Sequence, residues 1–319
     1  MPSNKVNFFD LDIQYQKYKK ILNQNILKTL KTSQYILGSE VKNFENRIAQ
    51  MSLNKYAVGT SSGTDSLLIS LLAIGVKKGD EIITSSFSWL SSVEVILLLG
   101  AKPVYVDINL NDFNMDIKEI EKKITKKTKA ILSVSLFGYP CQIDEIKKIA
   151  KKKGITLIED SAQSFGSKIR SKPISFFADI TCYSFFPSKT LGAFGDAGGI
   201  VTNNSNIFKK LYQIRNHGQK YYAKSNKVLG VNGRLDEIQA AILTTKLTFF
   251  KKEISLRQKI AKKFIKLFDE NNVSGYTITE KKKNHVYSQF SFLVKNRKKF
   301  SQFFSQAKIP IKIFYPDAF

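Results

Sequence analysis

From Lys55 onward, short runs of β-branched and aromatic residues alternate with amphipathic stretches, and this alternation limits the possible folds more than any other feature of the chain. The runs are YAVG, DEIITSS, KPVYVDI, KAILSVSL and ITLIED, and the stretches between them cover residues 65–74, 91–99, 116–124 and 144–153. Strands and helices in this alternation form a mostly parallel sheet with helices on both faces. We therefore predict an α/β fold with a large, doubly covered sheet.

Other elements are expected on both sides of this region. Residues 15–32 carry apolar side chains at helical spacing and predict a helix. Two further strands are expected at 179–184 and 199–202. A long helical pattern follows, from Arg234 to about Phe268.

The last part of the chain predicts a second, smaller unit. Residues 286–294 predict a strand, and residues 300–319 predict a helix followed by a strand. A chain of 319 residues also exceeds what a single hydrophobic core usually serves. We expect a large domain over 1–245 and a small α+β domain over 246–319.

Composition excludes several classes of protein. The longest candidate for a membrane span, 93–99, contains Glu94 and falls far short of the roughly 20 apolar residues that a membrane-spanning helix needs. The start, MPSNKVNFFDLD, lacks the apolar block of a signal peptide. Cys141 and Cys182 provide neither a disulfide framework nor the spacing of metal ligands, which is typical of the reducing cytoplasm. We expect a cytoplasmic protein with no membrane partner and no metal.

The net charge of +25 suggests a nucleic-acid partner, but the type of basic residue argues against one. Only six of the 51 basic residues are arginine, and the lysines are spread over the whole chain. Proteins that bind nucleic acid favour arginine because its planar fork grips phosphates and base edges. We expect no nucleic-acid partner. The positive field would still attract a small anionic substrate such as a nucleotide sugar.

The segment GTSSGTDSL, residues 59–67, joins a predicted strand to a helix that opens at Thr64 or Asp65. The amides and hydroxyls of such a turn, with the positive end of the helix, can bind a phosphate group. Ser, Thr and Asp are also ordinary helix caps, so this motif alone fits a capped helix equally well. It matches neither the dinucleotide nor the Walker glycine pattern, which argues against a dinucleotide or ATP site.

The segment LIEDSAQSFG places two acidic residues, Glu159 and Asp160, at the end of an apolar strand. Sheets of this class bind their ligands at the carboxyl ends of the strands. An aspartate there can pair with the protonated ring nitrogen of pyridoxal 5'-phosphate (PLP). Gln163 follows one helical turn later, within reach of the ring hydroxyl. A helix-capping role for Asp160 is the alternative.

A lysine with a distinctive context follows in CYSFFPSKTLGAFGDAGGI, residues 182–200. Lys189 lies in a loop of small and aromatic residues directly after a strand, and an amine in a partly apolar setting forms Schiff bases with carbonyl groups. The glycines that follow let a backbone approach a flat cofactor; they are Gly192, Gly195, Gly198 and Gly199. Ser184, five residues before Lys189, is placed to contact the same phosphate as Thr64. Only this context separates Lys189 from the many other lysines.

In the order GTSSGTDSL, EDSAQSFG, SFFPSK and GVNGRLDEIQAA, the chain resembles the DegT family of fold-type-I PLP enzymes, which aminate nucleotide-linked sugars. The resemblance runs from QYILGSEV to the last residue. It implies that Lys189 binds the cofactor covalently and that Asp160 pairs with the pyridine nitrogen. It assigns the remaining cofactor contacts to Gly63, Thr64 and Ser184 at the phosphate, Gln163 at the ring oxygen and Trp89 on the ring face. Without the family, core packing is the better explanation of Trp89.

The resemblance also implies how the protein assembles and meets its substrate. The family's asparagine, here Asn232, reaches across a dimer interface to the partner's phosphate, so we expect a homodimer with shared active sites. Arg234 is placed to bind a carboxylate of the amino donor or of a uronic acid. His217, in RNHGQ, and Tyr315 fall near the sugar pocket, and a structural role for His217 is equally open.

The implied reaction moves an amino group from glutamate, through PLP, to a ketone on a UDP-linked sugar, with Lys189 as the proton carrier. The stretches QYILGSEV, SFFPSKTLG and KKEISLRQK favour UDP-2-acetamido-2-deoxy-3-oxo-glucuronate as substrate, for lipopolysaccharide or O-antigen synthesis. A 4-keto nucleotide sugar is the alternative substrate, and a catalytically silent sensor or regulator is the alternative function. A dehydratase of this family would have histidine in place of Lys189.

The sequence departs from the family pattern at three places. Phe314 stands where a histidine commonly precedes Tyr-Pro, and Gly233 stands where a serine is usual. The chain ends at Phe319, whereas family members continue for several dozen residues. The small domain is therefore expected to be incomplete, and both a natively short chain and a fragment explain this ending.

Overall fold

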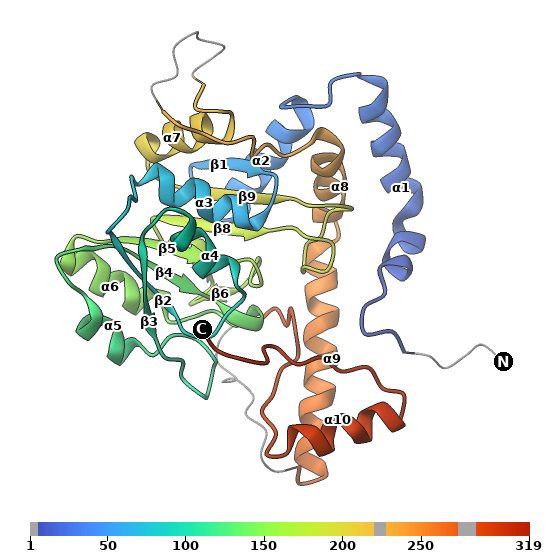
Figure 1. Ribbon diagram of the computed structural model, residues 1–319. Coiled ribbons are helices and arrows are strands. Elements are labelled where there is room, and N and C mark those ends of the chain that lie inside the picture. The colour runs from blue at the N-terminus through green and yellow to red at the C-terminus, as the bar shows by residue number, and fades with distance from the viewer. Residues whose placement is uncertain (1–5, 220–227, 274–284) are drawn as a thin grey trace.

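The computed structural model describes residues 6–219, 228–273 and 285–319, and its centre is a sheet of seven strands in the order β1-β9-β8-β5-β4-β2-β3 (Figure 1). The strands are β1 (Tyr56–Thr60), β2 (Glu81–Ser85), β3 (Lys102–Val106), β4 (Thr128–Val134), β5 (Thr156–Asp160), β8 (Ile180–Ser184) and β9 (Gly198–Thr202). All run parallel except β9, which pairs antiparallel with both β1 and β8. A short hairpin, β6 (Lys168–Ile169) with β7 (Lys172–Pro173), forms a separate sheet.

Helices cover both faces of the central sheet, which confirms the predicted α/β fold. The helices are α1 (Leu11–Lys31), α2 (Ser39–Met51), α3 (Gly63–Ala73), α4 (Ser91–Leu98), α5 (Ile117–Lys123), α6 (Ile143–Lys153), α7 (Ser205–Arg215), α8 (Glu237–Leu247), α9 (Phe250–Glu270) and α10 (Arg297–Gln306). Consecutive strand residues face opposite cores: Ile158 packs with α3, α4 and α7, and Leu157 packs with α5 and α6. Burial on both faces explains why the strands are continuous apolar runs.

The predicted long helix from Arg234 to Phe268 is wrong, because the structure divides it into α8 and α9. Leu247 ends α8, and α9 begins at Phe250. Phe249, between them, stacks on Tyr18 of α1 with ring centroids 3.6 Å apart, and Phe250 enters the core. Residues 231–236 are extended instead of helical, since Arg234 bridges to Thr60. Packing therefore sets both ends of α8.

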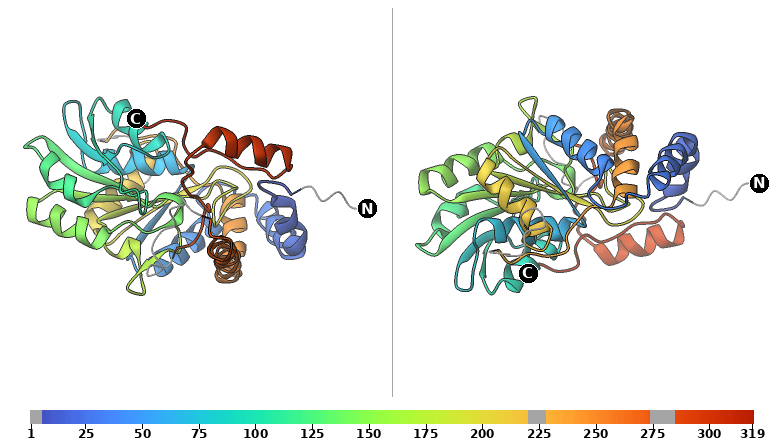
Figure 2. Two further views of the ribbon diagram at one scale, coloured as in Figure 1. Left: turned by 90° about the horizontal axis from the view of Figure 1, so that it is seen from below. Right: turned by 90° about the horizontal axis from the view of Figure 1, so that it is seen from above.

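The C-terminal segment contains the expected helix, α10, but the described residues 285–319 form neither of the two predicted strands. A strand needs a neighbour to pair with, and this segment pairs with a loop instead. The backbone N–H of Val286 donates to Gly138 (3.1 Å), and that of Gln289 donates to Phe137 (3.3 Å). Figure 2 shows α1 and α10 on the same side of the sheet, away from α5 and α6. The domain division at residue 245 stays a prediction.

Within the described ranges, no helix is both long and apolar enough to cross a bilayer. The same ranges contain no group of three or more His, Cys, Asp or Glu residues arranged to hold a metal ion. Cys141 and Cys182 are both free and buried.

Candidate active site

The turn after β1 and the start of α3 form one side of the site. Ser62 caps α3, since its hydroxyl accepts a hydrogen bond from the N–H of Asp65 (3.0 Å), and the helix begins at Gly63, slightly earlier than expected. A Cβ atom at Gly63 would lie 2.6 Å from the Cβ of Ser184, so only glycine allows this approach. Thr64, in the first turn, shares a hydrogen bond of 2.8 Å with Ser91. The predicted phosphate residues Gly63 and Ser184 are thus in contact at the positive end of a helix.

Asp160 and Lys189 lie close enough for the charge of each to affect the pKa of the other. Asp160 is the last residue of β5, beside β8, and Lys189 lies in the loop that follows β8. Burial raises the pKa of Asp160, while the N–H of Ala162 and the charge of Lys189 oppose this shift. Burial lowers the pKa of Lys189, and the charge of Asp160 opposes it. A partly buried amine with a lowered pKa is suited to attack a carbonyl group, and a buried carboxylate is suited to pair with a cation.

The residue before Asp160 has a different environment. Glu159 is completely buried, and both its carboxylate oxygens accept hydrogen bonds, from Ser133 and from Ser135. Burial raises the pKa of Glu159 to about 8, which the two hydroxyls oppose. Neighbouring residues of a strand face opposite sides of the sheet. Asp160 is therefore the acidic residue that the strand presents together with Lys189.

Gln163 is buried, and both ends of its side-chain amide are engaged. Its Oε1 accepts from the N–H of Phe137 (2.7 Å), and its Nε2 donates to the hydroxyl of Tyr315 (3.0 Å). An amide nitrogen carries two hydrogens, so one donor is left for a further acceptor such as a ring oxygen. Burial raises the pKa of Tyr315 to about 12, which the bond from Gln163 opposes.

Trp89 lies beside Tyr315, with ring centroids 6.0 Å apart and an angle of 48° between the rings. Trp89 is 59% exposed, so core packing does not explain this residue.

The capping alternative for Asp160 is also wrong, since the residues after it form turns and no helix. Its Oδ1 accepts from Ala162 (3.0 Å) within one of these turns.

Three of the residues predicted to contact substrate or partner, His217, Asn232 and Arg234, form a second group on two segments that run side by side, whereas Tyr315 lies beside Gln163 and Trp89. The N–H of the exposed His217 donates to Val231 (2.9 Å), and the exposed Asn232 bridges to Asn216. The guanidinium of Arg234 donates to the side chain of Asn216 (3.1 Å). The carbonyl of Gly233 accepts from the N–H of Ser61 (3.1 Å), which attaches this group to the turn before α3.

Sequence reasoning missed one buried ion pair that supports the same turn. Arg215 is 1% exposed, and its guanidinium contacts the carboxylate of Glu45 (2.5 Å) and the carbonyl of Gly59 (2.9 Å). The carboxylate of Glu45 also accepts from the N–H of Gly59 (2.8 Å). The available signal was the rarity of arginine in the chain.

Comparison with known proteins places this geometry in a family. The profile of the DegT/DnrJ/EryC1/StrS aminotransferase family matches residues 16–319. The chain belongs to this family. The UDP-2-acetamido-2-deoxy-3-oxo-D-glucuronate aminotransferase of Pseudomonas aeruginosa is 41% identical over 311 residues, which are 98% of this chain and 86% of the relative. A "pleiotropic regulatory protein" of Geobacillus stearothermophilus is 38% identical, covering 98% of this chain and 84% of that protein.

Solved structures agree with the sequence comparison. NtdA from Bacillus subtilis, solved with bound cofactor PMP, superposes with a TM-score of 0.92 at 30% identity, covering all of this chain and 74% of that one. The protein is thus a nucleotide-sugar aminotransferase that depends on PLP. The residues present fit this cofactor, because the close contact of Gly63 with Ser184 at a helix N-terminus suits a phosphate and the pair of Lys189 with Asp160 suits an aldehyde and a ring nitrogen.

Proposed function

We propose that the protein transfers an amino group from glutamate to the 3-keto group of UDP-2-acetamido-2-deoxy-3-oxo-glucuronate, in the synthesis of a bacterial surface polysaccharide. The observation that carries this proposal is the electrostatic interaction of Lys189 with Asp160, together with the close approach of Gly63 to Ser184 on β8, the strand next to β5. The choice of sugar is supported by the named activity of the Pseudomonas aeruginosa relative. A homodimer in the cytoplasm is the form in which we expect the enzyme to act.

Each residue has a defined task in this proposal. Bound PLP supplies an electron-withdrawing ring through which nitrogen moves between an amino acid and a ketone. Lys189 would hold the cofactor and, once released from it, its partly buried amine with a lowered pKa takes a proton from the α-carbon of glutamate. Asp160 keeps the ring nitrogen positively charged. Gly63, Thr64 and Ser184 bind the phosphate, Gln163 donates to the ring oxygen, and Trp89 covers the ring.

The roles of the substrate-binding residues are inferred from their charge and position. Arg234 is held by Asn216 at 3.1 Å, which leaves other guanidinium donors for a carboxylate. A uronic acid sugar and glutamate both carry such a carboxylate. His217 and Tyr315 are assigned to the sugar pocket, and Asn232 of the partner subunit completes the phosphate site.

The test is incubation of the PLP-loaded protein with glutamate and a panel of UDP-linked 3-keto and 4-keto sugars, with release of 2-oxoglutarate as the measurement. With glutamate alone we expect at most one 2-oxoglutarate per site; repeated turnover should require a sugar, be fastest with the 3-keto uronic acid and vanish in Lys189→Ala. Preference for a 4-keto sugar would overturn the substrate assignment.

A second candidate function is a PLP-binding regulator without turnover, which the name of the Geobacillus stearothermophilus relative favours. Incubation with glutamate alone distinguishes the aminotransferase from the silent regulator. An aminotransferase releases 2-oxoglutarate in a single turnover as the absorbance of the bound cofactor changes. A silent regulator keeps its cofactor spectrum unchanged when glutamate is added.

A further inference from the structure

A buried lysine outside the site described above makes contact with the loop that carries Lys189. Lys246, on α8, is 3% exposed, and it is the one buried lysine among residues 6–219, 228–273 and 285–319. Its Nζ donates a hydrogen bond to the carbonyl oxygen of Gly192 (2.7 Å) and lies 4.7 Å from the ring centroid of Phe194. A buried amine needs such partners, because burying an unpaired polar group costs free energy.

The loop between β8 and β9 is folded tightly around Lys189. The N–H of Lys189 donates to Phe186 (2.8 Å), and the N–H of Ala193 donates to Phe185 (2.7 Å). A Cβ atom at Gly192 would lie only 2.2 Å from the carbonyl oxygen of Pro187, so the two sides of the loop touch. Because the two sides are in contact, a displacement of the Gly192 carbonyl would also displace the turn that contains Lys189.

A second residue of α8 holds the same loop. The side-chain Oε1 of Gln239 accepts a hydrogen bond from the N–H of Phe194 (2.9 Å). Gln239 and Lys246 are seven positions apart, which places them on one face of the helix. The loop after Lys189 is thus fixed to α8 at two successive points, Gly192 and Phe194.

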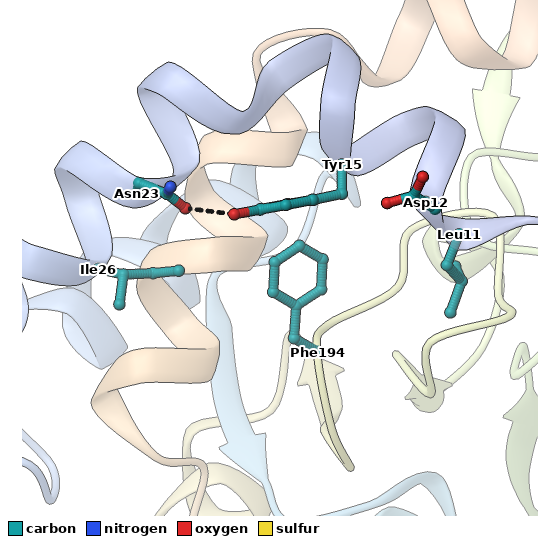
Figure 3. A pocket seen from close by; sticks show the side chains of 6 residues that line it. All are labelled: Leu11, Asp12, Tyr15, Asn23, Ile26 and Phe194. Carbon is teal, nitrogen blue, oxygen red and sulfur yellow. Dashed lines mark hydrogen bonds between the residues drawn. The ribbon is translucent and has the colours of Figure 1, made fainter.

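The opposite side of the loop is less firmly packed. The ring of Phe194 meets Tyr15 of α1 edge to face, with centroids 6.0 Å apart. Figure 3 shows Phe194 pointing toward α1, where Tyr15 bonds to Asn23, and these residues line an open pocket together with Ile26. On this side α1 meets the loop through a ring contact, whereas α8 holds the loop backbone through two hydrogen bonds.

We propose that Lys246 is a positioning residue for Lys189, which holds the loop through the carbonyl of Gly192 so that the amine of Lys189 stays beside Asp160. This inference rests on the proposed role of Lys189. Burial lowers the pKa of Lys246 to about 8, and the charge of Glu253 opposes this shift. Both the ammonium and the amine form keep hydrogens on Nζ, so the bond to Gly192 is available in either form.

The experiment compares Lys246→Met, which has no donor, with Lys246→Arg, which retains one, and with Lys251→Met at an exposed position of α9 as the matched control. Hydrogen exchange of the cofactor-free proteins reports on the amides of Lys189, Ala193 and Phe194. The rate at which added PLP becomes fixed to the chain by borohydride reports on Lys189. Neither measurement requires a sugar substrate.

In Lys246→Met we expect exchange at these amides about tenfold faster and cofactor attachment about tenfold slower, since a hydrogen bond to a charged donor contributes about 1.5 kcal/mol or more. Lys246→Arg should restore both to within about threefold, and Lys251→Met should change neither. If Lys246→Met does not fold, Gln239→Leu removes the second attachment point and should produce the same two changes.

A loss of thermal stability with unchanged exchange and attachment would overturn the proposal, as would a folded Lys246→Arg that restores neither. If PLP fails to attach even to the unsubstituted protein, the proposed function is wrong, and the exchange measurement still decides whether Lys246 holds the loop.

Discussion

The side-chain amide of Gln163 donates a hydrogen bond of 3.0 Å to the hydroxyl of Tyr315, which lies 152 positions later in the sequence. The other end of the same amide accepts from Phe137 at 2.7 Å. Gln163 is therefore held in a single orientation by the turn after β4 and by the C-terminal segment. This contact brings Tyr315 to the residues predicted to surround the cofactor ring.

Tyr315→Phe should lower kcat/KM about five- to tenfold, because the amide of Gln163 loses an acceptor worth about 1 kcal/mol. The pKa of Tyr315, raised to about 12, keeps the hydroxyl protonated at neutral pH. We therefore expect the pH profile of kcat/KM to keep its shape in the variant. A titration that disappears from the profile below about pH 9 would show that Tyr315 acts as an acid or a base instead.

Asp160→Asn should retain the cofactor but lower the rate of transamination about 100-fold or more. An amide cannot balance a positive ring nitrogen, and losing a buried charge-assisted hydrogen bond costs about 3 kcal/mol. The measurement is a single turnover with glutamate, alongside the amount of PLP bound. Asp107→Asn, on the loop after β3, is the matched control. Near-normal turnover in Asp160→Asn would refute the role given to this residue.

Glu237 caps a helix that is distant in the sequence. Its carboxylate accepts from the backbone N–H groups of Gly38 (2.7 Å), Val41 (2.9 Å) and Glu40 (2.8 Å), at the start of α2. Glu237→Gln should lower the free energy of unfolding by about 2 kcal/mol, because its amide turns an NH2 group toward one of these donors. Urea unfolding measures the change. Glu270→Gln, which removes only an exposed ion pair with Lys266, should change little.

His285 gives stability a defined dependence on pH. Burial lowers its pKa to about 3, against a backbone contact with Gly138 that opposes the shift. The unfolded chain takes up a proton as the pH falls below about 6.5, whereas the folded chain does not until about pH 3. The neutral His285 therefore makes its full contribution to stability above about pH 6.5. This contribution is lost as the pH falls toward 3, by up to about 1.4 kcal/mol per pH unit.

The measurement is the difference in urea stability between the protein and His285→Gln at several pH values. His285→Gln retains an acceptor for the N–H of Tyr287, which the imidazole Nδ1 accepts at 2.9 Å. The difference should shrink steadily as the pH falls from 6.5 toward 5. A difference that stays constant over this range would contradict a neutral, buried His285. His217→Gln controls for the loss of an exposed imidazole.

The strands were predictable because their signal is local, whereas elements fixed by distant partners were not. The apolar runs around Ile83, Ile131 and Leu157 contain enough information to identify strands buried on both faces. The break before Phe250 has no glycine or proline to announce it, since it arises from the stacking of Phe249 on Tyr18. The segment 286–294 has strand-like residues, but a strand forms only where a partner offers its hydrogen bonds.

The site shows the same division. Motifs predicted Gly63, Asp160 and Ser184 as site residues, because the small residues and the acid stand at the ends of recognisable strands. The buried charges of α8, Glu237 and Lys246, lie within a mostly apolar stretch and resemble ordinary surface residues of the helix. Their partners are backbone groups of distant loops, which no local pattern reveals.

Assembly leads to the last prediction, that the active unit is a homodimer in which each site uses Asn232 of the other chain. The loop around Asn232 is held by its own chain, since Gly233 donates to Arg215 (3.0 Å) and accepts from Ser61 (3.1 Å). Asn232 itself is exposed in the single chain. A twofold interface uses the same surface on both chains, so one exposed residue at a fixed loop can complete both sites at once.

Complementation distinguishes this arrangement from a site contained in one chain. Lys189→Ala and Asn232→Ala chains are each weak alone, and a mixed dimer with shared sites combines the Lys189 of one chain with the Asn232 of the other. After subunit exchange in an equal mixture, about half of the dimers are mixed and each has one intact site, so activity should recover to about one quarter of the unsubstituted level. If Asn232 served its own chain, no mixed dimer would contain an intact site. Absence of recovery after demonstrated exchange, or full activity at dilutions where only monomer remains, would refute the shared site.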